Sequence, residues 1–235
     1  MGNMGALVSR RPIFDEAYGE QVVLKDGAAV SLGLLRPRDR ALVLEAWERL
    51  SPESRYQRFH AVKKGLTEAE LRYLTELDQV DHLAIGAIRA HRGERAGVGV
   101  ARFVRLADRP ASADFAVTVI DDWQRKGLGR FLLTRLIAAA RERGIERLES
   151  SVLATNAAMR HIIRSVVPGS IERADGRLVA VEMPLNLATS LSADDVPARA
   201  RLPEGDRRAP SMRRSSTLDA ISPPGRSGRA RPVSC

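Results

Sequence analysis

Three strand-like segments follow one another with only short turns between them, and this limits the possible topologies sharply. Apolar and β-branched residues dominate residues 82–89, 97–106 and 113–120, and turn-forming residues separate them at 92–94 and 108–110. Connections this short leave no room for a crossover, so neighbouring strands have to pair antiparallel. The sequence therefore predicts an antiparallel meander.

Helices and a hairpin are predicted before the meander. The Asp26-Gly27 pair favours a tight turn between two short strands within residues 22–32. A helix is expected after Pro37, and a second one is expected where Ser51 can cap it and proline takes its first position. Thr67 opens a capping box and starts a third helix.

The segment after the meander returns to alternating helices and strands. Apolar residues recur three and four positions apart from 128 to 139, which predicts an amphipathic helix, and Gly144 is placed to end it. A strand over 147–153, a helix over 156–164 and a hairpin around the Asp175-Gly176 turn complete the pattern. The predicted class is a mixed α/β (α+β) fold, with a mainly antiparallel sheet flanked by helices.

Composition divides the chain into three parts. Residues 1–20 are interpreted as an N-terminal extension and 21–187 as one folded domain. Residues 188–235 hold nine arginines, five acidic residues and no aromatic residue, so they are predicted to be a disordered basic tail. This tail could attract nucleic acid, but it lacks aromatic side chains for stacking on bases, so nucleic acid is not expected as a partner.

Several classes of protein and site are not expected. The chain has no apolar run long enough to span a membrane and no secretory leader, so we expect a cytoplasmic protein without a membrane partner. The single cysteine, Cys235, cannot form an internal disulfide, and the four histidines lack the spacing of a zinc site. No metal cofactor is therefore predicted.

The segment 121–130 carries the clearest chemical signal. It joins a strand to a helix, and a helix N-terminus offers unpaired amide hydrogens and a positive dipole end to an anion. Gly127 and Gly129 leave space for a phosphate, and Arg125, Lys126 and Arg130 add positive charge. The spacing matches neither a dinucleotide-binding fingerprint nor a P-loop. A diphosphate group is the expected ligand.

The pattern Gln124-x-x-Gly127-x-Gly129 after an antiparallel strand resembles the acetyl-CoA signature of the GNAT N-acetyltransferase superfamily. Residues 50–59 and 113–119 further resemble the GNAT domain of bacterial Pat-type protein lysine acetyltransferases. The resemblance implies a GNAT-like sheet and acetyl-CoA as acyl donor. It also implies an amine acceptor, plausibly a protein lysine.

The same resemblance assigns roles to individual residues. The backbone of Val117 and Val119 would pair with the pantetheine arm as an added strand, beside a gap in the sheet. The implied contacts with the diphosphate come from the backbone of Gln124, Arg125, Lys126, Gly127, Leu128, Gly129 and Arg130. Asn156 would contact the cofactor near its reacting end.

The resemblance also implies direct attack of the amine on the thioester carbonyl. A lysine amine has a reference pKa of about 10.4, so few molecules are neutral at pH 7 and a base helps. Asp114 stands where Pat-type enzymes carry an acidic residue proposed as that base, and its short side chain would act through a water. An ordinary solvated carboxylate at the start of a strand is the alternative interpretation of Asp114.

Two departures from the family pattern keep a second function open. Many members carry a tyrosine seven residues after the asparagine, as the acid that protonates the leaving thiolate, but Ile163 stands here. His161 is a possible substitute, although a histidine on a helix surface is more often a bystander. The usual Gly-Phe is also replaced within 165–170. A non-catalytic domain that senses acyl-CoA is therefore the alternative hypothesis.

Overall fold

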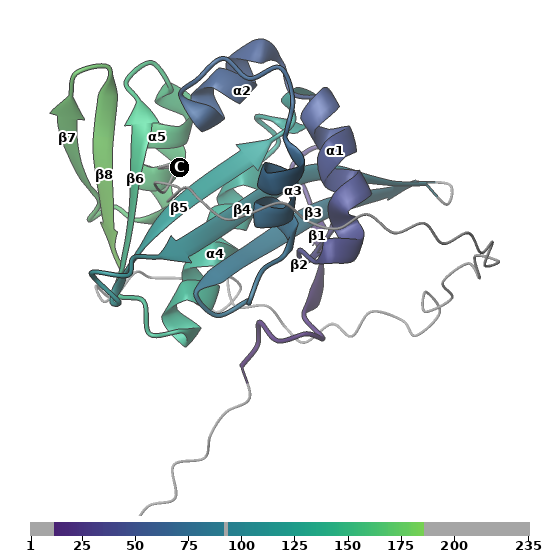
Figure 1. The fold of residues 1–235 in the computed structure, drawn as a ribbon, viewed down its shortest axis with the longest axis horizontal. Helices are drawn as coiled ribbons and strands as arrows, with labels where there is room; N and C mark the ends of the chain where they lie inside the picture. The colour runs from purple at the N-terminus through teal and green to yellow at the C-terminus, as the bar shows by residue number, and fades with distance from the viewer. Residues whose placement is uncertain (1–11, 92–93, 186–235) are drawn as a thin grey trace, which may run out of the picture. The chain divides into compact units, whose positions relative to one another are not determined.

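The computed structural model describes residues 12–91 and 94–185. In this part of the chain eight strands form one sheet, in the order β1-β2-β3-β4-β5-β6-β8-β7 (Figure 1). The strands are β1 (Gly19–Val23), β2 (Ala29–Leu34), β3 (His82–His91), β4 (Glu94–Arg105), β5 (Ser112–Val119), β6 (Arg147–Leu153), β7 (Ile171–Asp175) and β8 (Leu178–Pro184). The predicted tail, residues 1–11 and most of the predicted turn at 92–94 lie outside the described residues.

Two of the helices begin at the predicted caps, Ser51 and Thr67. The elements are η1 (Pro37–Asp39), α1 (Arg40–Glu48), α2 (Pro52–Phe59), α3 (Glu68–Thr75), η2 (Asp121–Trp123), α4 (Leu128–Glu142) and α5 (Ala157–Val166). Ser51 Oγ accepts a hydrogen bond from the Ser54 amide, and Thr67 and Glu70 form the predicted capping box. Gly144 ends α4 at a φ of +69°, a conformation that glycine adopts without strain. No helix within the described ranges has the length and apolar character needed to cross a bilayer.

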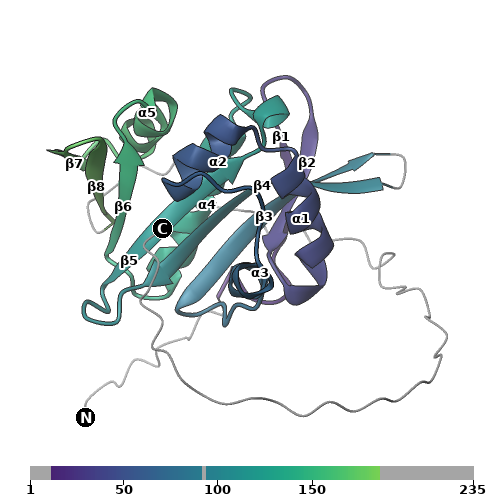
Figure 2. The same ribbon diagram turned by 45° about the horizontal axis from the view of Figure 1, so that its top comes forward.

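The central sheet lies between two layers of helices (Figure 2). A bulge at Val98 in β4 turns its neighbouring glycines to opposite faces. A Cβ on Gly97 would lie 2.9 Å from the Leu42 carbonyl oxygen of α1, and one on Gly99 would lie 3.0 Å from the Leu132 side chain of α4. The two glycines therefore let helices approach both faces closely. The expected mixed α/β fold with a mainly antiparallel sheet is confirmed.

One parallel pair interrupts the antiparallel order. Strands β3, β4 and β5 form the predicted meander, but β5 then pairs with β6 in parallel. That pairing covers only 112–114 against 147–149, after which the two strands continue without pairing to each other. Strand β6 instead pairs along its whole length with β8 on its other side. The sheet is therefore continuous at one end and split at the other.

The segment before β1 packs onto the domain. Phe14 is 1% exposed and Tyr18 is 8% exposed, and both belong to the hydrophobic core. The amides of Ile13 and Phe14 donate to the Glu142 carboxylate at the end of α4. Part of the sequence interpreted as an extension therefore contributes to the core.

A buried ion pair fastens β1 to α4. Glu20 accepts hydrogen bonds from Arg135 Nε at 2.7 Å and from the Tyr18 hydroxyl at 3.0 Å, and the Arg135 side chain is 4% exposed. Burial and the neighbouring Glu20 raise the pKa of Tyr18, which keeps its phenol protonated. The Glu20 carboxylate thus compensates the charge of the buried Arg135 guanidinium.

Removal of this carboxylate charge should destabilise the fold. We expect Glu20→Gln to lower the free energy of unfolding by about 3 kcal/mol, because one member of a buried pair loses its charge. Denaturant unfolding measures the change. Glu16→Gln, at an exposed position nearby, is the matched control and should stay within about 0.5 kcal/mol of wild type. Equal stability of the two variants would contradict the role of the pair.

Candidate active site

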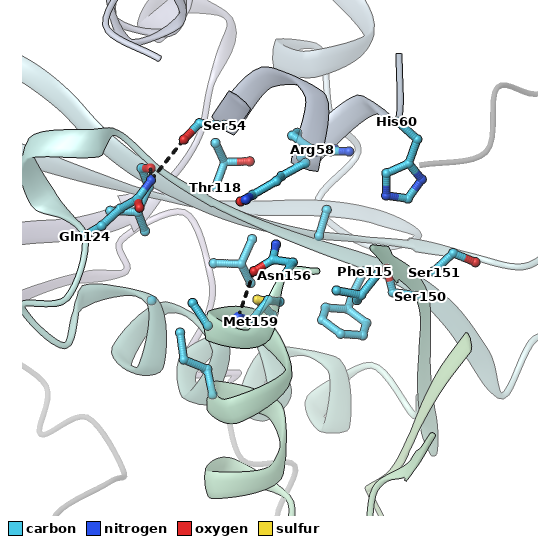
Figure 3. A pocket seen from close by; sticks show the side chains of 18 of the residues that line it. Ser54, Arg58, His60, Phe115, Thr118, Gln124, Ser150, Ser151, Asn156 and Met159 are labelled. Carbon is cyan, nitrogen blue, oxygen red and sulfur yellow. Dashed lines mark hydrogen bonds between the residues drawn. The ribbon is translucent and has the colours of Figure 1, made fainter. Parts of the chain in front are cut away.

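A cleft opens where β5 and β6 separate. Its empty volume is about 1000 Å³ including the solvent at its mouth. Strands β5 and β6 line it with Phe115–Val119 and Ser150–Val152 (Figure 3). Helix α2 with its C-cap contributes four residues, and helix α5 with its N-cap contributes four more. The rest of the lining consists of Gln124 and Arg125 of the loop and Gly129 at the start of α4. Three stretches that are distant in sequence, within residues 54–60, 115–129 and 150–162, therefore meet at this gap in the sheet.

The edge of β5 in the cleft carries unpaired backbone groups. The Ile120 amide donates to the Val98 carbonyl of β4, and backbone groups along a strand alternate between its two neighbours. Thr118 and Ala116 therefore face β4, whereas Val117 and Val119 face the gap. Among the residues described, the side chain that bonds to this edge is that of Gln124, whose Nε2 donates to the Val119 carbonyl at 3.1 Å. The two valines offer an edge to which an extended ligand can add.

The loop between η2 and α4 presents a run of free amides. Within residues 12–91 and 94–185, no protein group accepts from the amides of residues 125–130, and the next amide, that of Phe131, donates to the Gly127 carbonyl. Arg125 and Gly127 have φ values of +60° and +94°, so the backbone bends sharply here. Such consecutive amides at a helix N-terminus form an anion site.

The side chains of this loop differ in exposure and in their partners. Arg125 and Arg130 are exposed, and Leu128 is buried in the core. Lys126 Nζ lies 3.0 Å from Asp26 Oδ2 and 5.1 Å from the centre of the Trp123 ring. A Cβ on Gly129 would lie 3.2 Å from Ile162 of α5, so this glycine also brings α4 and α5 together. The charge of Lys126 is thus already compensated.

Asn156 serves first as a helix cap. Its Oδ1 accepts a hydrogen bond from the Met159 amide at 3.0 Å, and this bond assigns the other amide atom, Nδ2, to the side that faces the cleft (Figure 3). Asn156 can therefore donate to a ligand without giving up its cap. Asn156 is also among the residues that line the cleft.

The adjacent carboxylates Asp121 and Asp122 do not form a pair. Asp121 accepts from the Ser51 amide at 2.9 Å and from the hydroxyls of Ser51 and Ser54. Burial opposes its ionisation, but these hydrogen bonds lower the pKa of Asp121 overall. The carboxylate therefore stabilises the start of α2 and joins that helix to the loop. No group of three potential metal ligands occurs in the described part of the chain.

Asp114 stands at the closed end of the gap. It is half-buried, and it pairs in register with Val104 of β4 and with Glu149 of β6, the last residue before the strands separate. It is not among the residues that line the cleft, whereas its neighbour Phe115 is. His82 lies in the same cross-strand row, and burial together with Arg102 lowers its pKa to about 4.

The cleft also contains two residues that sequence reasoning did not select. Arg58 and His60 extend into it from the end of α2 (Figure 3). Burial and the charge of Arg58 lower the pKa of His60, so this imidazole is mostly neutral at pH 7. Arg58 lies at the end of the segment 50–59 that resembles Pat-type enzymes, and His60 follows that segment directly. This position was the available signal.

Residue 163, where many members of the superfamily carry an acidic tyrosine, lies in the core of this structure. Ile163 is fully buried in the core, so this position holds an apolar packing residue. His161 is exposed and is not among the cleft-lining residues. Trp47 and Trp123 are both buried, so they act as apolar anchors of the core and of the loop before α4.

Comparison with known sequences decides the family. A profile described as the acetyltransferase (GNAT) family matches residues 35–165, more than half of the chain. The chain belongs to the GNAT acetyltransferase family. This GNAT chain is 33% identical over 156 residues to "Acetyltransferase PA5475" of Pseudomonas aeruginosa, and the match covers 66% of the chain and 83% of the relative.

Similarity to Pat proteins is also found. The chain is 36% identical over 142 residues to "Acetyltransferase Pat" of Mycolicibacterium smegmatis. This match covers 60% of the chain but only 42% of that longer relative. The crystal structure of the GNAT domain of S. lividans PAT superposes with a TM-score of 0.64 at 28% identity, covering 71% of the chain and 96% of that domain. The predicted resemblance to the GNAT domain of Pat enzymes is confirmed.

The family fixes the enzyme class and the donor. GNAT acetyltransferases use acetyl-CoA, and the residues of this chain fit such a ligand. The fit rests on three observations: a gap in the sheet, an unpaired strand edge beside it, and six free amides at a bend that requires glycine at position 127. The predicted enzyme class and cofactor are therefore those of the family.

Proposed function

We propose that this GNAT chain transfers the acetyl group of acetyl-CoA to an amine, most specifically a protein lysine side chain, by direct attack. The observation that carries the proposal is the juxtaposition of the cleft between β5 and β6 with the free amides of residues 125–130. Acetyl-CoA matches both features, because its pantetheine arm can lie in the cleft while its diphosphate binds the free amides. Its thioester supplies an activated acetyl group.

Different parts of acetyl-CoA would bind to different predicted residues along the cleft. The backbone of Val117 and Val119 would hold the pantetheine arm as an added strand, and the free amides of residues 125–130 would hold the diphosphate. The Gln124 amide, which the sequence included in this set, instead donates to the Asp121 carbonyl. Asn156 Nδ2 would donate near the reacting end. Free amides on the β5 edge would stabilise the negative charge that develops on the carbonyl oxygen.

The acceptor amine has to lose a proton. Because about one lysine in a thousand or fewer is neutral at pH 7, a nearby carboxylate that accepts a proton through a water raises the reactive fraction. We assign this role to Asp114, which lies next to Phe115 at the closed end of the cleft. The assignment to a lysine acceptor is supported by the similarity to Pat enzymes over residues 50–59 and 113–119.

The proposal is tested in two steps. First, acetyl-CoA at a hundredfold excess over its Kd should stabilise the fold by about 2.7 kcal/mol, measured as a thermal shift. Second, coenzyme A release should be followed with lysine-containing peptides and with a panel of small amines. Release with peptides supports the proposal, and release only with small amines contradicts the lysine acceptor.

The same two steps distinguish the acetyltransferase from the alternative function, a non-catalytic acyl-CoA sensor. Stabilisation by acetyl-CoA without release for any acceptor would support the acyl-CoA sensor. The specific observation behind that alternative is Ile163, which is buried where an acid would be needed to protonate the leaving thiolate. No stabilisation at millimolar acetyl-CoA would contradict both functions.

A further inference from the structure

The turn between β1 and β2 lies against the loop that carries the free amides. The Lys25 amide donates to the Lys126 carbonyl at 3.3 Å, and the Asp26 carboxylate binds the Lys126 ammonium. Figure 2 shows this turn beside η2. The β1–β2 hairpin is therefore docked on the loop by a backbone bond and an ion pair, although about a hundred residues separate them in the sequence.

The side chain of Lys25 runs along Gly127. Its Cγ, Cδ and Cε atoms are 3.8–4.0 Å from the position that a Cβ on Gly127 would occupy. This contact places the aliphatic stem against the backbone of the bend, next to the free amides. Lys25 as a whole is exposed, and its side chain is flexible, so the ammonium can turn toward an anion held by the loop.

The two lysines at the loop differ in their partners. The Lys126 ammonium is bound to Asp26, whose pKa it lowers. No carboxylate forms an ion pair with Lys25 in the described parts of the chain, although Asp26 is its neighbour in sequence. Lys25 is therefore the lysine whose charge remains available, and it comes from an element to which the sequence assigned no role in the site.

We propose that Lys25 binds the diphosphate of acetyl-CoA, so that the β1–β2 turn forms an additional wall of the cofactor site. The inference rests on the proposed function. The diphosphate is the expected partner because the Lys25 side chain occupies the space beside Gly127, within 4.0 Å of where a Cβ would be, at the centre of the run of free amides. An ammonium beside an anion already held by amides adds a charge-assisted hydrogen bond.

The test is a titration of the full chain with acetyl-CoA, dephospho-acetyl-CoA and S-acetylpantetheine. We expect Lys25→Ala to weaken the binding of acetyl-CoA and of dephospho-acetyl-CoA by about tenfold each, because both carry the diphosphate. S-acetylpantetheine, which lacks phosphate altogether, should bind equally to wild type and variant. Lys25→Arg, which keeps the charge, should retain most of the affinity.

The salt dependence and a control variant distinguish loss of the Lys25 charge from a change in the fold. The effect of Lys25→Ala should shrink as the ionic strength rises, because an exposed charge is screened. Arg95→Ala removes a basic side chain from the β3–β4 hairpin and should leave all three affinities unchanged. Melting temperatures of both variants should match the wild type.

The outcomes that overturn the inference are distinct from those that overturn the function. Unchanged acetyl-CoA affinity in Lys25→Ala, with normal binding by the wild type, rejects the role of Lys25 alone. A loss confined to acetyl-CoA and absent for dephospho-acetyl-CoA also rejects it, because the contact would then be with the 3′-phosphate. Failure of the wild type to bind acetyl-CoA rejects the proposed function itself.

Discussion

Glutamate in place of Gly127 should abolish measurable binding of acetyl-CoA. Two effects act together: the carboxylate would occupy the bend where the diphosphate is expected, and its charge would repel that group. The backbone also has a φ of +94°, which an L-residue rarely adopts. We expect the Kd to rise by about a hundredfold or more, which corresponds to at least about 2.7 kcal/mol of lost binding free energy. Calorimetric titration measures this change.

A matched glycine separates ligand repulsion from backbone strain. Gly176, in the turn between β7 and β8, also has a positive φ of +60°, and a Cβ added there would meet no atom within 4 Å. Gly176→Glu should lose some stability through strain but keep its affinity for acetyl-CoA. If both variants lose binding equally, the effect is structural, and residues 125–130 are not the diphosphate site.

Asparagine in place of Asp114 should lower kcat by about a hundredfold or more, with little change in the KM for acetyl-CoA. The amide preserves the shape of the side chain but cannot take a proton from the acceptor amine. The reaction then depends on the small fraction of amine that is already neutral. The deficit should therefore shrink as the pH approaches the lysine pKa of about 10.4. A pH–rate profile for both enzymes measures this, and Asp114→Glu should retain activity.

Glu149→Gln is the sharpest control for this assignment. Glu149 pairs directly across from Asp114 at the closed end of the cleft, and its carboxylate is bound to Arg109 at 2.7 Å. We expect this variant to keep most of its kcat. The opposite result, a loss of kcat in Glu149→Gln and none in Asp114→Asn, would indicate that Glu149 on β6 is the general base. A deficit in Asp114→Asn that does not vary with pH would indicate a structural role.

The free amides of the loop explain why a short glycine motif is informative in this chain. Gly127 allows the bend, and Gly129 allows α5 to approach α4 within contact of Ile162. Leu128 between them is buried, so it anchors the turn while its backbone remains at the site. In the proposed site the motif thus combines access for the diphosphate at Gly127 with helix packing at Gly129, and neither function alone would require both glycines.

The amino-acid sequence by itself determined the local elements and the position of the glycine-bearing turn before α4, which we propose as the diphosphate site. Ser51 and Thr67 cap the helices they were expected to cap, the helix expected from residue 156 begins next to Asn156, and the strand predicted over 147–153 has those bounds. These features could be predicted because they depend on residues within about four positions of one another, through caps, turns and periodicity.

Only the tertiary structure decided which distant segments complete the site. The short parallel pairing of β5 with β6, the bond from Ser51 to Asp121 and the contact of Lys25 with Gly127 each join residues far apart in the chain. Such contacts follow from how whole elements bury their apolar faces against the sheet, and no local pattern records that outcome. The cleft is where this packing leaves β5 and β6 unpaired.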